Sequence, residues 1–266
     1  MRLLNLACGD RFHKDWINID FHSNSSSVIR VNILKGLDFE SNTFDAVYTS
    51  HFLEHLPKNK AVFVLKEIYR VLKPGGILRV VVPDLENIAR EYLKILENIN
   101  NEDYKERYEW IILELLDQMV RNKPGGEMID IYNNVKKEKN LVLARYIQDR
   151  VGERLLENNF KKDLMNFSFD KVKNKILYLY LKLIKYLIPS DIRDLIFVNT
   201  SIGEKHCWMY DTYSLSKILT ECGYLDIKRM AYNQSQIQNF NSYFLDSDTN
   251  GFPYKGCSSL YIEGRK

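Results

Sequence analysis

The hydrophobic and polar positions of the first part of the chain follow the pattern of an α/β sheet. Four short apolar runs are strand candidates, at residues 2–6, 16–20, 28–33 and 44–49. Residues 61–72 carry a helical apolar face, and the run Lys73-Pro74-Gly75-Gly76 predicts the end of that helix before a strand over 77–82. Strands that alternate with helices in this way are typical of βαβ units around a parallel sheet.

After about residue 86 the pattern changes, because long helical periodicities replace the strand-like runs. Helices are expected over 102–121, roughly 135–158 and 170–188. We therefore expect residues 87–200 to form a helical insertion within the sheet domain.

The last part of the chain returns to the sheet pattern. A helix is expected over 214–222, where Ser214 is followed by Lys217 in place of the Glu or Gln of a full capping box. Apolar runs over 224–232 and 259–263 predict a closing pair of strands. The expected domains are thus a sheet domain made of 1–86 and 201–266, and the insertion or cap of 87–200.

Composition and charge narrow the class of protein. With 45% hydrophobic and 27% charged residues in 266, the chain falls in the globular range. A net charge of +3 gives no broad basic face, so a nucleic-acid partner is not expected. The four cysteines form no C-x-x-C pair, which indicates neither a disulfide framework nor a structural metal. No signal peptide or transmembrane helix is expected, so the prediction is a reduced, cytoplasmic protein.

A turn after the first strand could receive an anionic group. The segment Asn5-Leu6-Ala7-Cys8-Gly9-Asp10 joins a strand to the following chain but does not fit G-x-G-x-x-G, so a dinucleotide is poorly provided for. Taken alone, it could be an ordinary turn. Asp20 ends the second strand, where a carboxylate can accept both hydroxyls of a ribose, and Asn32 ends the third, where its amide could meet an adenine edge.

These segments together resemble a known family, the class I S-adenosylmethionine-dependent methyltransferases. The resemblance rests on LNLACGD, WINID, FDAVYTSHFLEHL and EIYRVLKPGGILRVVVPDLE, in that order, and resumes at His206-Cys207-Trp208-Met209-Tyr210-Asp211 and at SSLYIEGRK. It implies a doubly wound, seven-stranded and mostly parallel sheet whose last strand is antiparallel. Parts of the insertion, at 115–121 and 124–128, look similar to enzymes encoded with bacterial surface-polysaccharide pathways.

The resemblance implies S-adenosylmethionine as cofactor and places its binding residues. Ala7 and Gly9 would contact the methionyl part, Asp20 the ribose and Asn32 the adenine. Further positions complete the expected cofactor set: Ser50 and His51 beside the methyl-bearing sulfonium, and Asn5, Cys8 and Phe21 around the turn and the ribose strand. Ala7 departs from the first glycine common in the family. Most relatives also carry a helix before the first strand; none precedes Met1 here, so the insertion is expected to form the lid.

Methyl transfer is an in-line displacement, so the protein mainly supplies alignment and, for a weakly acidic acceptor, a base. No metal is expected. His51 is the first candidate base because imidazole titrates near neutrality, although it could equally serve only as a hydrogen-bonding group. Glu54 and His55 could orient it or serve the local fold. Asp84 and His206 are further candidate catalytic residues, and Asp84 could instead cap the helix after it.

Substrate contacts are expected from the insertion and from the segment after it. His206 and Tyr210 are candidate substrate-binding residues, whereas Trp208 and Met209 could be core. Arg121 could pair with an anionic group of the substrate, and a solvated salt bridge is the alternative. The Lys-rich segment 161–185 predicts a basic amphipathic helix that could touch a membrane or, more simply, pack on its own domain.

The sequence therefore predicts an O-methyltransferase for a small polar acceptor, of which a sugar, sugar nucleotide or phosphorylated capsule precursor is favoured by resemblance alone. One alternative is methylation of a lipid-linked glycan at a membrane surface. Another is a cofactor-binding interaction module without catalysis. The acceptor atom and the oligomeric state stay open.

Overall fold

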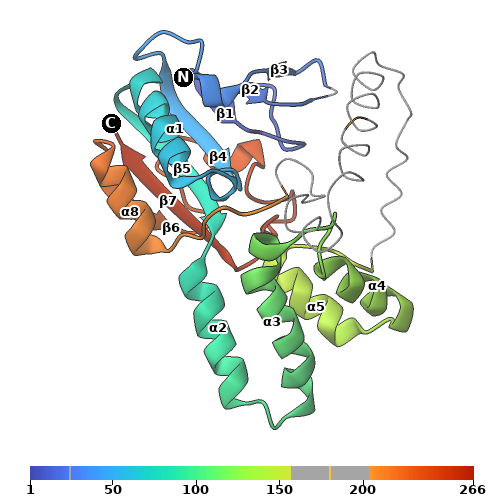
Figure 1. Ribbon diagram of the computed structural model, residues 1–266. Coiled ribbons are helices and arrows are strands. Elements are labelled where there is room, and N and C mark those ends of the chain that lie inside the picture. The colour runs from blue at the N-terminus through green and yellow to red at the C-terminus, as the bar shows by residue number, and fades with distance from the viewer. Residues whose placement is uncertain (24, 157–179, 181–203) are drawn as a thin grey trace.

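The computed structural model describes residues 1–23, 25–156, 180 and 204–266 (Figure 1). It contains a seven-stranded sheet in the order β3-β2-β1-β4-β5-β7-β6. The strands are β1 (Leu3–Leu6), β2 (Ile17–Asp20), β3 (Val28–Arg30), β4 (Phe44–Ser50), β5 (Leu72–Pro83), β6 (Leu225–Met230) and β7 (Ser259–Arg265). Pairs within β1 to β5 are parallel, and β7 is antiparallel to both β5 and β6. The predicted sheet and its antiparallel last strand are confirmed.

The strand order reverses direction beside β1. The chain proceeds outward from β1 to β2 and β3, then returns to place β4 on the other side of β1. In open α/β sheets the crevice at such a reversal lies at the carboxyl ends of the two central strands and is where ligands bind. Here those ends are the turn after Leu6 and the residues after Ser50.

The two faces of the sheet are covered differently. Helices α1 (Lys58–Val71) and α8 (Thr212–Glu221) lie on one face, where Leu65, Ile68 and Leu215 belong to the largest apolar cluster (Figure 1). Trp16 and Tyr48 on the other face pack against the chain that follows β6, which includes the short helix η3 (Phe240–Tyr243).

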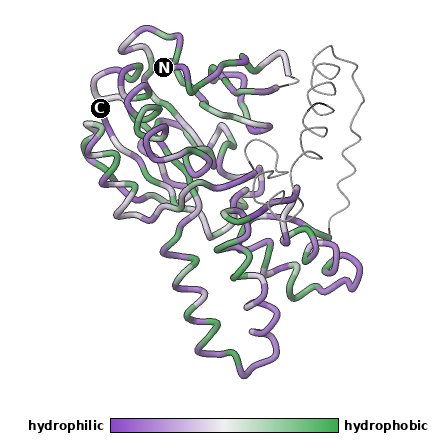
Figure 2. The backbone as a smooth tube through the Cα atoms, in the orientation of Figure 1, coloured by the Kyte–Doolittle hydropathy of each residue, from purple (hydrophilic) through white to green (hydrophobic). Residues whose placement is uncertain are grey.

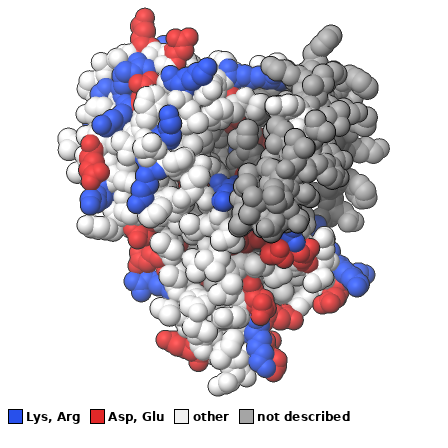
Figure 3. All heavy atoms as spheres, viewed as in Figure 1, with Lys and Arg blue, Asp and Glu red and all other residues white. Residues whose placement is uncertain are grey.

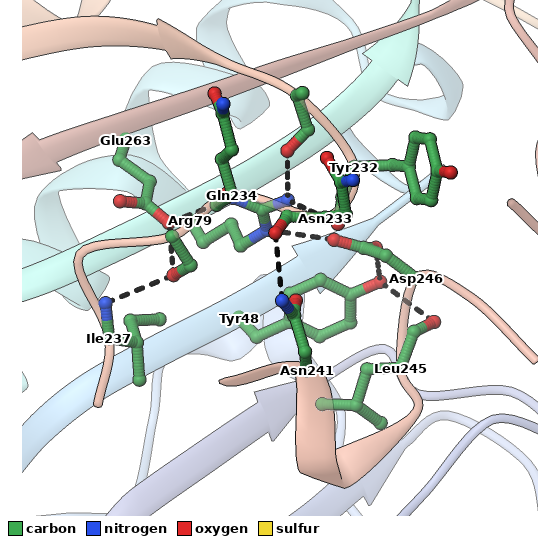
Figure 4. A network of polar contacts seen from close by, with 12 residues as sticks. Tyr48, Arg79, Tyr232, Asn233, Gln234, Ile237, Asn241, Leu245, Asp246 and Glu263 are labelled. Atoms are coloured by element: carbon green, nitrogen blue, oxygen red, sulfur yellow. Dashed lines mark hydrogen bonds and ion pairs between the residues drawn. The ribbon is translucent and has the colours of Figure 1, made fainter. Parts of the chain in front are cut away.

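A buried arginine fastens this later chain to the sheet. Arg79 of β5 donates from Nε to Asp246 and from a terminal nitrogen to Glu263, both at 2.8 Å (Figure 4). Its guanidinium also donates to the carbonyl oxygens of Gln234, Ala231 and Tyr232. A buried cation is tolerable only with such complete pairing, so the segment that contains residues 231–246 is fixed to the sheet.

The insertion begins with a pair of long helices, α2 (Leu85–Glu97) and α3 (Glu102–Val120), which project away from the sheet (Figure 1). The turn between them is hydrophilic (Figure 2). They are followed by α4 (Met128–Glu138) and α5 (Leu141–Val151), which pack with Trp110 of α3 in a separate apolar cluster. The helix predicted over 102–121 is confirmed.

The single helix expected over 135–158 is wrong, because two helices meet within that range. Lys139 adopts a left-handed conformation, with φ of 53°, which ends α4. The side chain of Asn140 then accepts a hydrogen bond from the Leu143 amide at 3.0 Å and begins α5. Asparagine is among the best N-cap residues, and the apolar periodicity on either side hid this break.

The start of α8 also differs from the expectation. The N-cap is Asp211, whose side chain accepts from the Ser214 amide at 2.7 Å, while Ser214 Oγ accepts from the Asp211 amide at 3.0 Å. Ser214 therefore occupies the N3 position of a capping box and not its N-cap position.

Both signs of charge are spread over the face seen in Figure 3. No helix of the described part of the chain is long and apolar enough to cross a membrane. The helix expected over 170–188 and the Lys-rich face within 161–185 lie outside the described residues, except for Tyr180.

Candidate active site

A cavity of about 510 Å³ opens at the carboxyl ends of β1 and β4. Six of the predicted cofactor residues line it: Asn5, Ala7, Cys8, Gly9, Ser50 and His51. Six further residues that were not predicted from the sequence complete the lining: Asp10, Arg11, Tyr48, Leu245, Tyr254 and Lys255. This first cavity is within the size range of small-molecule and cofactor sites.

The turn after β1 is built from left-handed backbone. Ala7 has φ of 55° and Gly9 has φ of 52°. A non-glycine residue in this region costs about 1–2 kcal/mol, so Ala7 fills the first glycine position of the motif at some cost in strain but without a change of turn. The Cys8 amide between them donates to the Ile19 carbonyl at 3.1 Å and ties the turn to β2.

Asp20 holds the same turn from the next strand. Its Oδ2 accepts a hydrogen bond from the Gly9 amide at 2.9 Å, and its Oδ1 accepts from the His22 amide at 3.0 Å. Each carboxylate oxygen can accept more than one hydrogen bond. Asp20 is thus oriented by the protein and retains acceptor capacity for the two hydroxyls of a ribose.

Three of the predicted cofactor residues, Asp20, Phe21 and Asn32, are not among the residues that line this cavity. Phe21 packs near Phe52, with ring centroids 6.4 Å apart. Asn32 is exposed, and its side chain accepts from the Leu34 amide to cap the short helix η1 (Ile33–Lys35). Their contacts with a cofactor stay predictions.

Two of the lining residues have a structural role as well. Asn5 is buried and donates to the Arg11 carbonyl and to Asn18 Oδ1, at 2.8 and 3.0 Å. Burial raises the pKa of the Cys8 thiol to about 12, and the nearby Asp20 carboxylate adds to that shift. Cys8 is therefore a neutral thiol at physiological pH and a poor nucleophile.

His51 lies where the first cavity meets a second one of about 260 Å³, and it lines both. It follows β4 in a left-handed conformation with φ of 50°, and its amide donates to the Val81 carbonyl at 2.8 Å. Its Nδ1 lies 3.3 Å from Oε1 of Glu54, and its Nε2 lies 3.0 Å from Ser259 Oγ. The carboxylate on one side of the ring favours a proton on Nδ1, which leaves Nε2 as the acceptor nitrogen.

Burial is the main cause that lowers the pKa of His51, and the charge of Lys255 lowers it further, while Glu54 acts in the opposite direction. Burial also lowers the pKa of Lys255. Lys255 is the other residue that lines both cavities. No periodicity or motif marks it, because it lies in the irregular segment just before β7.

The insertion supplies one wall of the second cavity. Glu114, Gln118 and Arg121 from the end of α3 line it, together with Tyr132 of α4. They face His51 and His206 on the sheet side of the same cavity. This part of α3 thus turns inward, toward the sheet.

Arg121 is held by a buried ion pair, so the alternative of a solvated salt bridge is wrong. Its Nε donates to Asp117 at 3.0 Å, and a terminal nitrogen contacts the same carboxylate. The other oxygen of Asp117 accepts from the Glu127 amide at 2.6 Å. A side chain on Gly126 would collide with Asp117. Arg121 thus reaches the cavity with its charge largely balanced.

A second buried pair lies behind that wall. Arg150 of α5 donates from Nε and from a terminal nitrogen to Glu114, at 3.1 and 2.7 Å. Trp110 Nε1 donates to the same carboxylate at 2.9 Å. No sequence pattern predicts this pair, because Glu114 and Arg150 belong to different helices.

Asp84 has the structural role that the sequence allowed as its alternative, a cap for the helix after it. It is fully buried, and Oδ1 accepts from the Glu86 and Asn87 amides at 3.1 and 3.3 Å to cap α2. Its Oδ2 accepts from Arg229 at 2.6 Å. With both oxygens engaged and neither cavity reached, Asp84 has no acceptor oxygen to offer a substrate.

The residues predicted to contact substrate in the segment after the insertion lie in different surroundings. Tyr210 is 1% exposed, belongs to the core under α1 and α8 and lines neither cavity, so its contact with a substrate stays a prediction. Met209 is buried as expected, whereas Trp208 is 37% exposed and lies under the Lys58 ammonium.

His206 is buried and lines the second cavity. Burial lowers its pKa to about 4, an effect that Glu54 partly opposes. The ring is therefore neutral at physiological pH. Among the predicted substrate residues, His206 and Arg121 are the two that reach this cavity.

Residues 11–80 match the family described as a methyltransferase domain. The chain is 50% identical over 48 residues to the probable methyltransferase ltbC of Aspergillus luteorubrus, which is 18% of this chain and 17% of that protein. It is 29% identical over 162 residues to the demethylmenaquinone methyltransferase of Staphylococcus aureus, which is 48% of this chain and 63% of that protein. The matched segments thus span less than two thirds of the length of these relatives.

Among solved structures, the chain aligns with a SAM-dependent methyltransferase from Archaeoglobus fulgidus at 12% identity and a TM-score of 0.39, over 100% of this chain and 86% of that one.

The fit to a cofactor follows from the chain itself. Three features lie together at one edge of the sheet. They are a left-handed turn, an acidic residue anchored on the neighbouring strand and a cavity at the reversal of strand order. Together with the match of residues 11–80 to a methyltransferase domain, these features fit S-adenosylmethionine as the cofactor.

Proposed function

We propose that this protein transfers a methyl group from S-adenosylmethionine to an oxygen atom of a small polar acceptor. The observation that carries the proposal is the position of His51, which lines both the first cavity and the second. A group placed between a cofactor cavity and an acceptor cavity is suited to receive a proton from the acceptor as the methyl group arrives.

The cofactor supplies a methyl group already activated by positively charged sulfur. The turn of residues 7–9 and Asp20 would hold it in the first cavity, with Ser50 and His51 beside the reacting end. An acceptor hydroxyl in the second cavity would take the place of Ser259 Oγ beside Nε2 of His51 and give its proton to that nitrogen. Its oxygen would form the new bond to the methyl carbon as the bond between that carbon and sulfur breaks. The positive charge on the ring is then stabilised by Glu54, 3.3 Å from Nδ1.

The polar lining of the second cavity supports a polar acceptor. Hydrogen-bonding side chains face it from both sides, namely His51, Glu114, Gln118, Arg121, His206 and Lys255. Sugars and sugar nucleotides offer hydroxyl groups to such a surface, and we propose them, with phosphorylated capsule precursors, as the acceptor class on the strength of the sequence resemblance. Lys255 is the cation best placed for an anionic part of the acceptor, because the charge of Arg121 is balanced by Asp117.

The proposal is tested by binding and turnover in parallel. Calorimetric titration with S-adenosylhomocysteine measures the cofactor site, and mass spectrometry of incubations with a panel of sugars, sugar nucleotides and sugar phosphates detects products heavier by one methyl group. Products that disappear in His51→Ala support the proposal. Tight cofactor binding with no methylated product from any acceptor class would favour a cofactor-binding interaction module instead.

A further inference from the structure

Two histidines and a glutamate form a cluster beside the second cavity. Glu54 and His55 lie in the short helix η2 (Leu53–His55), and His206 lies far along the chain, after the insertion. One potential ligand atom from each of the three residues lies within 4.8 Å of those from the other two. The rings of His55 and His206 meet edge to face, with centroids 4.9 Å apart.

The backbone around the cluster is firmly tied. The Glu54 carbonyl accepts hydrogen bonds from the amides of Cys207 and Trp208, at 2.7 and 3.1 Å. The His206 amide donates to the Gln118 carbonyl of α3 at 2.8 Å. These bonds hold the segment of residues 206–208 against η2, so the three side chains are positioned by the fold.

The carboxylate of Glu54 lacks the partners that burial demands. It is 0% exposed, and neither of its oxygens has a hydrogen bond within the described part of the chain. The imidazole nitrogens of His51 and His55 lie 3.3 and 4.0 Å from Oε1, at ion-pair distances. A buried, ionised carboxylate without hydrogen bonds is costly and is usually paired or bound to a metal.

The hydrogen bond of His55 to the backbone determines which of its ring nitrogens carries the proton. The nitrogen without a proton is the one that faces the Glu54 carboxylate. Nδ1 lies 3.0 Å from the Lys205 carbonyl oxygen, which can only accept, so Nδ1 carries the hydrogen. In the neutral ring Nε2 then has a lone pair, and this is the atom near Glu54. A lone pair beside a carboxylate is unfavourable unless a cation lies with them. Donation of the other ring N–H to a backbone carbonyl is also the arrangement that orients metal-binding histidines.

We propose that Glu54, His55 and His206 form a binding site for one divalent transition-metal ion, with Zn²⁺ as the preferred ion. Two imidazoles and one carboxylate are a known ligand set of zinc sites that keep a position open for water or substrate. Because His206 lines the second cavity, the open position would lie toward the acceptor. An ion there would polarise an acceptor oxygen. The proposal revises the expectation that no metal is needed, and it does not depend on methyl transfer.

The test measures metal binding directly. The full chain is treated with a chelator, dialysed and titrated with Co²⁺, whose visible absorption reports ligand number and geometry, and with Zn²⁺ by calorimetry. We expect one ion per chain and a Co²⁺ spectrum of low coordination number. Replacement of outer groups that only orient ligands typically costs 10- to 100-fold in affinity, so Glu54→Gln and His206→Gln should each weaken binding at least tenfold. The exposed His22 provides the matched control, and His22→Gln should bind as the parent does.

Some variants of a buried residue fail to fold, so circular dichroism and thermal unfolding accompany each titration. If Glu54→Gln does not fold, His55→Gln and His206→Gln carry the test. Equal Co²⁺ and Zn²⁺ affinity in the parent and in folded ligand variants would overturn the proposal, as would a parent that binds no ion.

Discussion

Asp20 and Gly9 are joined across two strands by a hydrogen bond of 2.9 Å, from the backbone amide of Gly9 to Oδ2 of Asp20. The carboxylate therefore shapes the turn that would hold one part of the cofactor and is itself placed to hold another. This double role makes the affinity for the cofactor sensitive to one side chain.

Asp20→Ala should weaken binding of S-adenosylhomocysteine severely, because hydrogen bonds to a charged group are worth about 1.5–3 kcal/mol each. Titration calorimetry measures the change. Asp15→Ala removes an exposed carboxylate near the same strand and should bind as the parent does. Unchanged affinity in a folded Asp20→Ala protein, or preference of the parent for NAD, would contradict the assignment.

His51→Ala should lower kcat by roughly 10²- to 10⁴-fold while the affinity for S-adenosylhomocysteine is kept, since the lost group acts on the proton of the acceptor. Steady-state kinetics with the best acceptor of the panel gives the two parameters. His13→Ala, at a histidine outside both cavities, serves as the control. A fully active His51→Ala enzyme would point to an acceptor oxygen that is already anionic and needs no base.

The Asp117–Arg121 pair should behave as one buried unit. Asp117→Leu alone leaves an uncompensated buried cation and should lower the free energy of unfolding by about 3–5 kcal/mol, whereas the double variant with Arg121→Leu should recover much of that loss. Urea denaturation of the two single variants and the double variant provides the comparison. Additive losses would show that the two side chains stabilise the insertion separately.

Ligands should slow hydrogen exchange across residues 102–130, because Glu114, Gln118 and Arg121 line the second cavity. Mass spectrometry with cofactor alone, acceptor alone and both together separates the two effects. We expect the larger protection when both are bound. Identical exchange in all conditions would make the insertion an appendage and not a lid.

Asp84→Ala should affect stability more than chemistry. It removes a helix cap, worth about 0.5–2 kcal/mol, and one of the hydrogen-bond partners of Arg229. Thermal unfolding should show a lower Tm, while the folded enzyme keeps its affinity for S-adenosylhomocysteine and most of its kcat. A large fall in kcat at unchanged Tm would return Asp84 to the list of catalytic candidates.

The parts of the molecule that the sequence predicts well are those specified by local pattern. The strand runs and the turn at residues 7–9 depend on neighbouring residues, and they place the edge of the sheet at which the first cavity opens. The run Lys73-Pro74-Gly75-Gly76, expected to separate helix from strand, lies within β5, which begins at Leu72 directly after α1. The break at Lys139 and Asn140 was missed because capping residues within a continuous apolar periodicity give only a weak signal.

Partners that are distant in sequence account for most of the remaining differences. From the sequence alone, Asp84 follows a strand at the edge of the sheet where ligands bind. In the structure, its carboxylate accepts a hydrogen bond from Arg229 of another strand. Lys255 enters the site from a segment without a pattern. Glu54 and His206 are brought together only by the return of the chain from the insertion. Such contacts are products of the tertiary fold and cannot be read from spacing.

The return of the chain has a consequence for how this protein could diversify. The chain leaves the sheet at Asp84 and re-enters at Tyr210, and these two residues form a parallel bridge, with the Leu85 amide donating to the Tyr210 carbonyl at 2.8 Å. An excursion that departs and returns at one point can lengthen, shorten or be exchanged without moving the strands on either side. Recombination at this junction could therefore give new acceptor preferences to an inherited cofactor domain, and grafting the insertion between related proteins is a practical route to altered specificity.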